Sequence, residues 1–132
     1  MRRAPFLLLL FLVPNLGCSR TPPPQAPAKG RVLVNGYPMR GGTVVFTPDA
    51  KRGARGPISM AVLDDNGAFQ LASDAGPGAV VGWHRVTVAP PPSSPDLMAG
   101  LERYRHPDLS NLQFEIRTNA DNEFTIALEW EP

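Results

Sequence analysis

The chain has 132 residues, of which 13 are basic and 12 acidic, a formal net charge of +1 and room for one domain. Arg2 and Arg3 would leave with a signal segment, so the mature chain has 11 bases against 12 acids and a net charge of −1. This balance excludes the strongly basic surface of a nucleic-acid-binding protein, and we predict no nucleic-acid partner. Sixteen prolines and 12 glycines favour many turns and few long helices.

An apolar stretch, FLLLLFLVPNLGC from Phe6 to Cys18, follows the two arginines. A basic end, an apolar middle and small residues before a cleavage site are typical of a secretory signal. A transmembrane helix needs about 20 apolar residues, and the apolar run over residues 4–13 has half that length. We therefore predict that residues 1–17 are a signal peptide and that Cys18 becomes the first residue of the mature chain.

Cys18 is the only cysteine, and its sequence context resembles the lipobox of bacterial lipoproteins. The resemblance implies that Cys18 is lipidated and anchors the protein to a membrane of the cell envelope, facing the periplasm or the surface. An unpaired cysteine in a secreted protein needs an explanation, and acylation provides one. Asn15 stands where a lipobox usually has leucine, so secretion without a lipid is the alternative.

The segment from Ser19 to Lys29, SRTPPPQAPAK, has four prolines among small and polar residues. Such a composition favours an extended polyproline spacer of about 3.1 Å per residue. We predict a linker over residues 18–29, including the lipidated Cys18, and a single domain over residues 30–132.

From Gly30 onward the apolar residues recur with a period of two, which is typical of strands. Asn35-Gly36 is a strong signal for a two-residue hairpin. The turn at Asp64–Gly67 predicts a second hairpin, between the runs on either side of it. The predicted strands are seven runs: 31–34, 43–47, 58–63, 68–71, 83–88, 112–116 and 124–130. They predict an all-β fold, a seven-stranded antiparallel Greek-key sandwich.

Two segments interrupt the strands. Leu97, Met98, Leu101 and Tyr104 fall at helical spacing and predict one short helix. This helix lies in the long loop over residues 90–111, where we expect either function or disorder. The polar and basic loop over residues 49–57 is predicted to be solvated.

The run 83–88 alternates strictly, so Trp83, Arg85 and Thr87 should share one face of a strand. Trp83 is then partly exposed and able to contact a ligand. His84 should lie on the opposite face with Val86 and Val88, as a half-buried histidine with its hydrogen bonds satisfied. In the last run, Trp130 continues the series Phe124, Ile126 and Leu128 and is predicted to lie in the core.

Several segments together resemble carboxypeptidase regulatory-like domains, in particular the small lipoproteins of this type that are common in planctomycete bacteria. They are the opening hairpin (residues 30–32, 35–39 and 41–48), a turn (65–69), a central strand (82–88) and the closing segments (102–104, 112–116 and 122–128). The resemblance covers nearly all of residues 30–132 and implies a transthyretin-like (prealbumin-like) β-sandwich. Fold transfers better than activity in such a comparison.

The sequence does not predict catalysis. His84 shares a face with valines, His106 lies in a polar loop, and no serine stands in a nucleophile-elbow pattern. Clustered cysteines and histidines, which zinc requires, are absent from the sequence. Asp64–Gly67 begins like a calcium loop, but the glutamate of the twelfth position is replaced by Ala75. We therefore predict no enzyme activity, no catalytic residue, no metal and no cofactor.

These observations predict a non-catalytic cell-envelope lipoprotein whose sandwich is a structural or protein-interaction module. A tethered carbohydrate-binding module is the alternative, because an exposed tryptophan can pack against a sugar ring. The expected partners are the membrane, through the lipid anchor, and an envelope protein or glycan. The candidate ligand contacts are Trp83, Arg103, Tyr104, Arg105 and His106.

Overall fold

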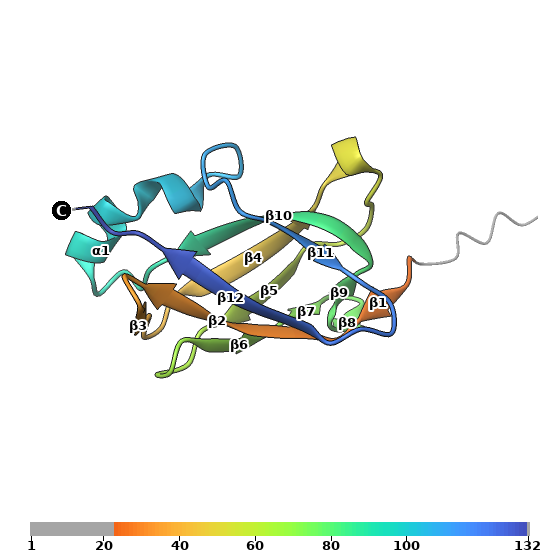
Figure 1. Ribbon diagram of the computed structural model, residues 1–132, viewed down its shortest axis with the longest axis horizontal. Helices are drawn as coiled ribbons and strands as arrows, with labels where there is room; N and C mark the ends of the chain where they lie inside the picture. The colour runs from red at the N-terminus through yellow and green to blue at the C-terminus, as the bar shows by residue number, and fades with distance from the viewer. Residues whose placement is uncertain (1–22, 132) are drawn as a thin grey trace, which may run out of the picture.

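The computed structural model describes residues 23–131; the predicted signal peptide and Cys18 lie outside the described residues (Figure 1). In chain order the elements are β1 (Gln25–Ala26), β2 (Ala28–Val34), β3 (Tyr37–Pro38), β4 (Thr43–Pro48), the 3₁₀ helix η1 (Ala50–Arg52), β5 (Ser59–Val62), β6 (Ala68–Gln70), β7 (Ala72–Ser73), β8 (Gly76–Pro77), β9 (Ala79–Val80), β10 (Gly82–Ala89), α1 (Pro95–Gly100), the 3₁₀ helix η2 (Glu102–Arg105), β11 (Gln113–Ile116) and β12 (Asn122–Leu128). Each of the seven runs predicted from the sequence overlaps one strand of three or more residues, and the other strands of the described residues have two residues each.

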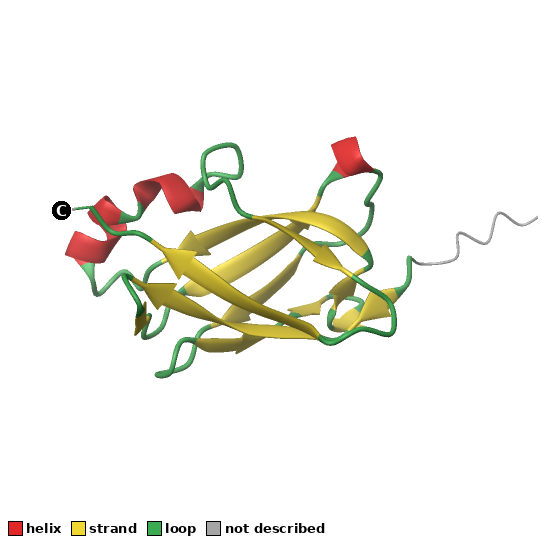
Figure 2. Cartoon of the chain, viewed as in Figure 1, coloured by secondary structure: helices red, strands yellow, loops and turns green. Residues whose placement is uncertain are grey.

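Two main sheets face each other, so the domain is an all-β sandwich (Figure 2). The larger sheet has the order β11-β10-β4-β5-β7-β8, and all its pairs are antiparallel. The smaller sheet has the order β12-β2-β3, with β6 also paired to β2. In it β12 runs parallel to β2, from Asn122 opposite Ala28 to Leu128 opposite Val34. The prediction of a fully antiparallel sandwich is therefore wrong at this pair.

The core lies between the two sheets and takes alternate residues from their strands. In β10 the residues His84, Val86 and Val88 are buried and their neighbours are not, so the predicted alternation is confirmed. Phe46 of β4 is fully buried, with the rings of Phe69, Phe114, Phe124 and His84 at centroid distances between 5.7 and 6.3 Å. Removal of these rings from water stabilises the sandwich.

Gly30 is the centre of a cross-strand row in the smaller sheet. It pairs with Phe69 of β6 on one side and with Phe124 of β12 on the other. A Cβ atom at this position would lie 2.7 Å from Cζ of Phe69, and closer still to the backbone oxygen of Phe124. The absence of a side chain therefore lets the Phe69 ring pack across β2.

The two predicted hairpins have different outcomes. Asn35 and Gly36 have φ values of 48° and 86°, and Val34 pairs with Tyr37, so the two-residue hairpin is confirmed. The turn at Asp64–Gly67 forms as expected, with the Gly67 amide donating to the Asp64 carbonyl at 3.0 Å. However, β5 belongs to the larger sheet and β6 pairs with β2. This turn therefore carries the chain from one sheet to the other, and the prediction of a hairpin here is wrong.

The folded domain begins before Gly30. Gln25 and Ala26 pair with Val80 and Ala79, and β2 starts at Ala28. The Asn122 side chain donates to the Pro27 carbonyl at 3.1 Å. The last residues of the predicted linker are thus strands held by the domain, because their backbone groups pair with segments that lie far away in the sequence.

The predicted short helix is present as α1 followed by η2. Leu101 is fully buried and Tyr104 nearly so. Trp130 is half-buried rather than in the centre of the core, and its indole lies where a side chain at Gly100 would otherwise stand. Gly100, which weakens the helix locally, is thus the surface on which the last tryptophan packs.

Candidate functional site

Trp83 lies at the start of β10 on the outer face of the larger sheet and is half-buried. The guanidinium of Arg52 lies 3.8 Å from the centroid of its ring, a cation–π contact. Arg52 also donates to the Gln113 side chain at 3.3 Å. The basic loop is therefore more than a solvated segment, because its arginine covers one face of Trp83.

The position of Arg52 depends on Asp49, which is buried at the start of η1. Its carboxylate accepts a hydrogen bond from the Lys51 amide at 3.1 Å and caps this helical turn. The Asp49 amide donates to the Trp83 carbonyl at 2.8 Å. The turn is in this way attached directly to the strand that carries the tryptophan.

A hollow of about 350 Å³ lies beside Trp83, at the open side of the sandwich. We define the open side by Phe114 of β11 and Phe124 of β12, half-buried edge-strand residues whose ring centroids lie 5.0 Å apart. Charged and amide groups complete the wall of the hollow, among them Glu115, which pairs with Arg117 at 2.9 Å. The hollow thus combines aromatic faces with polar groups.

Tyr104 does not belong to an exposed site, since it is only 3% exposed. Its hydroxyl accepts hydrogen bonds from the Arg103 guanidinium and, at 3.0 Å, from the Glu129 amide. The Arg103 guanidinium also lies over the Tyr104 ring, and its hydrogen bond to the hydroxyl raises the pKa of Arg103. The structure therefore places Tyr104 inside the fold, with its polar end occupied by Arg103 and the Glu129 amide.

Arg105 and His106 are exposed beside Glu102. The Glu102 carboxylate accepts from Arg105 at 2.9 Å and lies 3.1 Å from Nε2 of His106. The hydrogen bond from His106, followed by that from Arg105, lowers the pKa of Glu102. These contacts link neighbouring residues of η2 and the next turn, as is common on a helical surface.

The five predicted contact residues therefore divide into two groups. Four of them lie together in η2 and the residue that follows it: Arg103, Tyr104, Arg105 and His106. The fifth, Trp83, lies on β10 and packs against Arg52. Sequence reasoning missed Arg85, whose guanidinium lies 2.7 Å from Asp108 and 3.7 Å from the buried Asp49. The alternation over residues 83–88 indicates that Arg85 points outward. It does not identify the acidic partners, which are 23 and 36 residues away in the sequence.

His84 is fully buried rather than half-buried. Its Nδ1 lies 3.0 Å from the Gly82 carbonyl, while Nε2 has no partner among the described residues. Burial lowers the pKa of His84, and the bond to the Gly82 carbonyl offsets part of this effect. Ser59 is also buried, on β5, but β4 separates that strand from β10, so serine and histidine form no pair.

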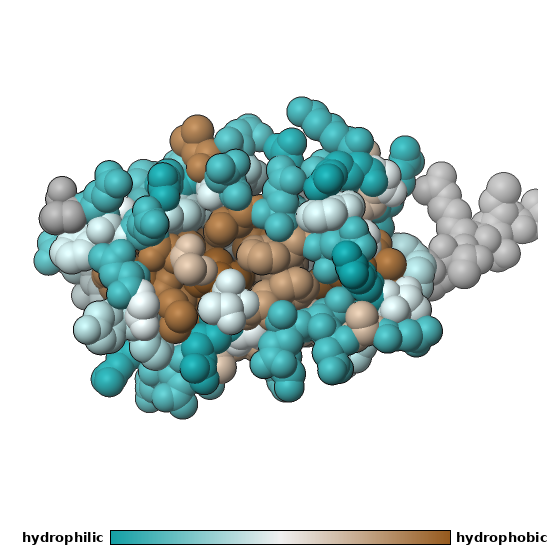
Figure 3. Space-filling view, in the orientation of Figure 1, coloured by the Kyte–Doolittle hydropathy of each residue, from teal (hydrophilic) through white to brown (hydrophobic). Residues whose placement is uncertain are grey.

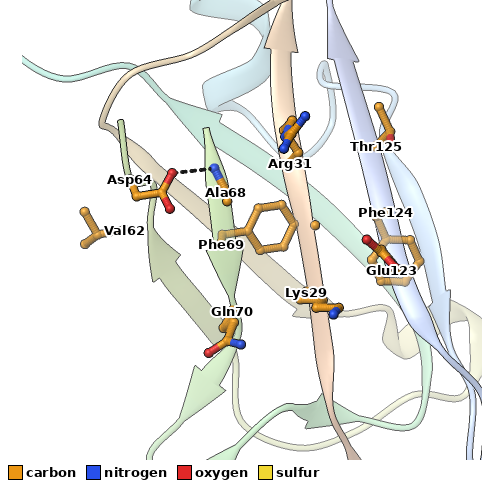
Figure 4. Close-up of a pocket in the computed structure, with 11 residues that line it drawn as sticks. Lys29, Arg31, Val62, Asp64, Ala68, Phe69, Gln70, Glu123, Phe124 and Thr125 are labelled. Atoms are coloured by element: carbon orange, nitrogen blue, oxygen red, sulfur yellow. Dashed lines mark hydrogen bonds between the residues drawn. The ribbon is translucent and has the colours of Figure 1, made fainter. Parts of the chain in front are cut away.

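A broader hollow of about 710 Å³ crosses the outer face of the smaller sheet, over β6, β2 and β12 (Figure 4). Lys29 and Arg31 stand on β2 in its middle, with Glu123 opposite Lys29 and Thr125 opposite Arg31. The Asp64 carboxylate accepts from the Ala68 amide at 2.9 Å at one side. Both charge signs are present, so this hollow has no clear preference for an anion or a cation.

Exposed apolar side chains form a row on the outer face of the larger sheet, at β5. The row consists of Ile58, Met60 and Val62, which alternate with less exposed residues. Val62 is 76% exposed, and Met60 stands opposite the half-buried Val45 of β4. The sequence shows this alternation, but it does not show which side faces solvent.

In residues 23–131, side chains of histidine, cysteine, aspartate and glutamate form no group of three able to hold a metal ion. The same part of the chain has no helix that is long and apolar enough to cross a membrane. Comparison with protein-family models, with curated proteins and with solved structures finds no match to this chain.

Proposed function

We propose that this chain is a non-catalytic cell-envelope lipoprotein whose sandwich is a structural or protein-interaction module. In this proposal the sandwich is a Greek-key domain of the carboxypeptidase regulatory-like, transthyretin-like type. The order of the sequence motifs over residues 30–132 supports this assignment to the transthyretin-like type. Lipidation of Cys18 is supported by the apolar run and the small residues that precede it.

The observation that carries the interaction role is the exposed apolar row of Ile58, Met60 and Val62. Scattered single apolar residues on a surface are normal, but these three lie in succession on one face of a sheet. A protein partner would remove their side chains from water, which favours association. This row is our candidate contact surface for an envelope protein.

A crosslinking experiment tests the interaction role. A photoreactive amino acid at Val62 should crosslink to an envelope protein in living cells. The same amino acid at Tyr37 is the matched control, since Tyr37 is 77% exposed. Crosslinks of equal yield from both positions, or none from Val62, would contradict the proposal.

The membrane anchor is tested separately. Cys18→Ser should move the protein from the membrane fraction to the soluble fraction, because one thiol carries the whole attachment. If the mass of the mature protein shows no fatty acid on Cys18, the proposed membrane anchor is wrong and the protein is secreted.

A second candidate function is carbohydrate binding at the hollow beside Trp83. The observation that favours it is a half-buried tryptophan next to carboxylate and amide groups, since sugars offer an apolar face and hydroxyl groups. Cell-wall and algal glycans should then change the tryptophan fluorescence of Trp130→Phe, in which Trp83 is the remaining tryptophan. A response that persists in Trp83→Phe, or no response to any glycan, would exclude this function for the hollow.

A further inference from the structure

β12 is the edge strand of the smaller sheet, with β2 as its neighbour on one side. Its seven residues, NEFTIAL, contain no proline and no lysine. Proline, lysine and short length are the usual protections of an edge strand against pairing with another chain. This edge therefore lacks the common devices that prevent strand addition.

The hydrogen bonds of β12 show which backbone groups are free. The Leu128 carbonyl accepts from the Asn35 amide at 2.9 Å, so the backbone groups of Leu128 point toward β2. Backbone groups alternate in direction along a strand, and those of Thr125 and Ala127 therefore point away from β2. Neither residue has a backbone hydrogen bond on that side within the part of the chain that the structure describes.

Both ends of this free stretch are closed by the fold. On one side the Glu123 amide donates to the Asp121 carbonyl at 3.1 Å, and on the other the Glu129 amide donates to the Tyr104 hydroxyl at 3.0 Å. The tyrosine oxygen occupies the place of an acceptor from an adjoining strand. The free edge, defined here as the backbone of Thr125, Ile126 and Ala127, is thus a short segment with four unpaired groups on Thr125 and Ala127.

The surroundings of the free edge are apolar, with acidic side chains along β12 and its C-terminal extension and the basic Lys29 and Arg31 on the neighbouring β2. β12 borders the open side of the sandwich, where Phe114 and Phe124 meet, and Figure 3 shows apolar side chains gathered in the middle of this face with hydrophilic ones around them. Figure 1 shows β10 and β11 on the side of β12 opposite to β2. Residues 121–131 have four carboxylates and no basic side chain. In the part of the chain that the structure describes, none of the four forms a salt bridge; they are Asp121, Glu123, Glu129 and Glu131.

We propose that the free edge of β12 accepts an extended segment of a partner protein that carries basic residues, which adds one strand to the smaller sheet. The backbone of Thr125 and Ala127 supplies the hydrogen bonds, and Glu123 and Glu129 select for positive charge at the two ends. Arg103 lies near Glu129, and Lys29 stands opposite Glu123 on β2, so each of the two carboxylates has a basic neighbour that offsets part of its charge. The proposal rests on the role of the domain as an interaction module but concerns another surface than the apolar row.

A second copy of the chain fits this edge less well. In a symmetric antiparallel pairing centred on Ile126, Thr125 would stand opposite Ala127 of the second copy, which satisfies the backbone. The same register places Glu123 opposite Glu129 of the second copy, on the same face. Like charges directly opposite each other destabilise a strand pair.

The test uses the full chain carrying Cys18→Ser and a capped synthetic peptide, KTVTVTK, whose lysines have the same spacing as Glu123 and Glu129. Hydrogen exchange at the Thr125 and Ala127 amides should slow by about tenfold when the peptide occupies nine-tenths of the sites. The matched control peptide, ETVTVTE, should bind about fivefold more weakly, as expected of two exposed ion pairs. Glu123→Lys should reduce or reverse this preference.

Two further measurements keep the proposal falsifiable. KTVTVTK with methylated backbone nitrogens should not bind. The variant Ala127→Pro should not bind the peptide either, because proline lacks the backbone N–H that points away from β2 at this position. Equal affinity for the lysine and glutamate peptides, or protection that maps to another strand, would overturn the proposal. Self-association that protects Thr125 and Ala127 without peptide would assign the edge to a second copy instead. The crosslinking from Val62 is independent of all these outcomes.

Discussion

The hydroxyl of Tyr104 accepts a hydrogen bond from the backbone amide of Glu129 across 25 residues of sequence, at 3.0 Å. This contact joins η2 to the end of β12 and closes the free edge of that strand. A side chain that the sequence suggested as a ligand contact is instead part of the framework.

We predict that Tyr104→Phe lowers the free energy of unfolding by about 1–2 kcal/mol, because the Glu129 amide and the Arg103 guanidinium both lose their acceptor. Chemical denaturation measures this loss. Tyr37→Phe, at an exposed position, is the control and should change stability by less than about 0.5 kcal/mol. Equal effects of the two variants would show that the hydroxyl of Tyr104 does not stabilise the fold.

Gly30→Ala should destabilise the domain by about 1–3 kcal/mol, although alanine usually lowers the entropy of the unfolded chain and stabilises. The reason is that the new Cβ atom would lie 2.7 Å from Cζ of Phe69 and closer still to the backbone oxygen of Phe124, so the neighbouring ring and strand must be displaced. Thermal denaturation of Gly30→Ala, Phe69→Leu and the double variant provides the measurement. Phe69→Leu removes the contact with the ring but not the contact with the Phe124 backbone, so the double variant should lose less than the sum of the two single variants only by the part that the ring contributes.

The buried His84 should make stability depend on pH. Its pKa in the folded chain lies below the ordinary value of 6.5, so the unfolded chain takes up a proton first as the pH falls. The contribution of neutral His84 to the free energy of unfolding is complete above about pH 6.5. Below that pH the free energy of unfolding falls by up to about 1.4 kcal/mol per pH unit, until His84 is protonated in the folded chain as well. Denaturation between pH 7 and pH 5 measures this slope, in a window where few carboxylates titrate.

The chain has two histidines, so His106 provides the control for His84. His106→Gln removes an exposed histidine and should leave most of the slope between pH 7 and pH 5. His84→Gln should flatten it, even if the variant is less stable at every pH. A slope that follows His106 instead would assign the pH dependence to the surface of η2.

Arg52→Ala should expose one face of Trp83 to water and shift its fluorescence emission to longer wavelength. The cation–π contact at an exposed site contributes about 0.5–1 kcal/mol, and a stability loss of that size should accompany the shift. The measurement is made in Trp130→Phe, so that Trp83 gives the whole signal. Arg55→Ala, in the same loop, is the matched control and should leave the emission unchanged.

Local patterns in the sequence determined several features of this protein. The alternation over residues 83–88 gave the buried and outward faces of β10 correctly, since side chains of a strand point to opposite sides in turn. Asn35-Gly36 gave the first hairpin, because both positions need positive φ. Each of these signals is complete within a few residues.

Only the tertiary structure decided which strands pair and which side chains meet. β12 lies parallel to β2 across more than 90 residues, the Asp64–Gly67 turn leads into the other sheet, and Arg52 covers Trp83 from a separate loop. No periodicity encodes such contacts, because they depend on how segments distant in sequence pack together to bury the common core. The open edge of β12 is a consequence of that packing and could not be found in the residues NEFTIAL by themselves.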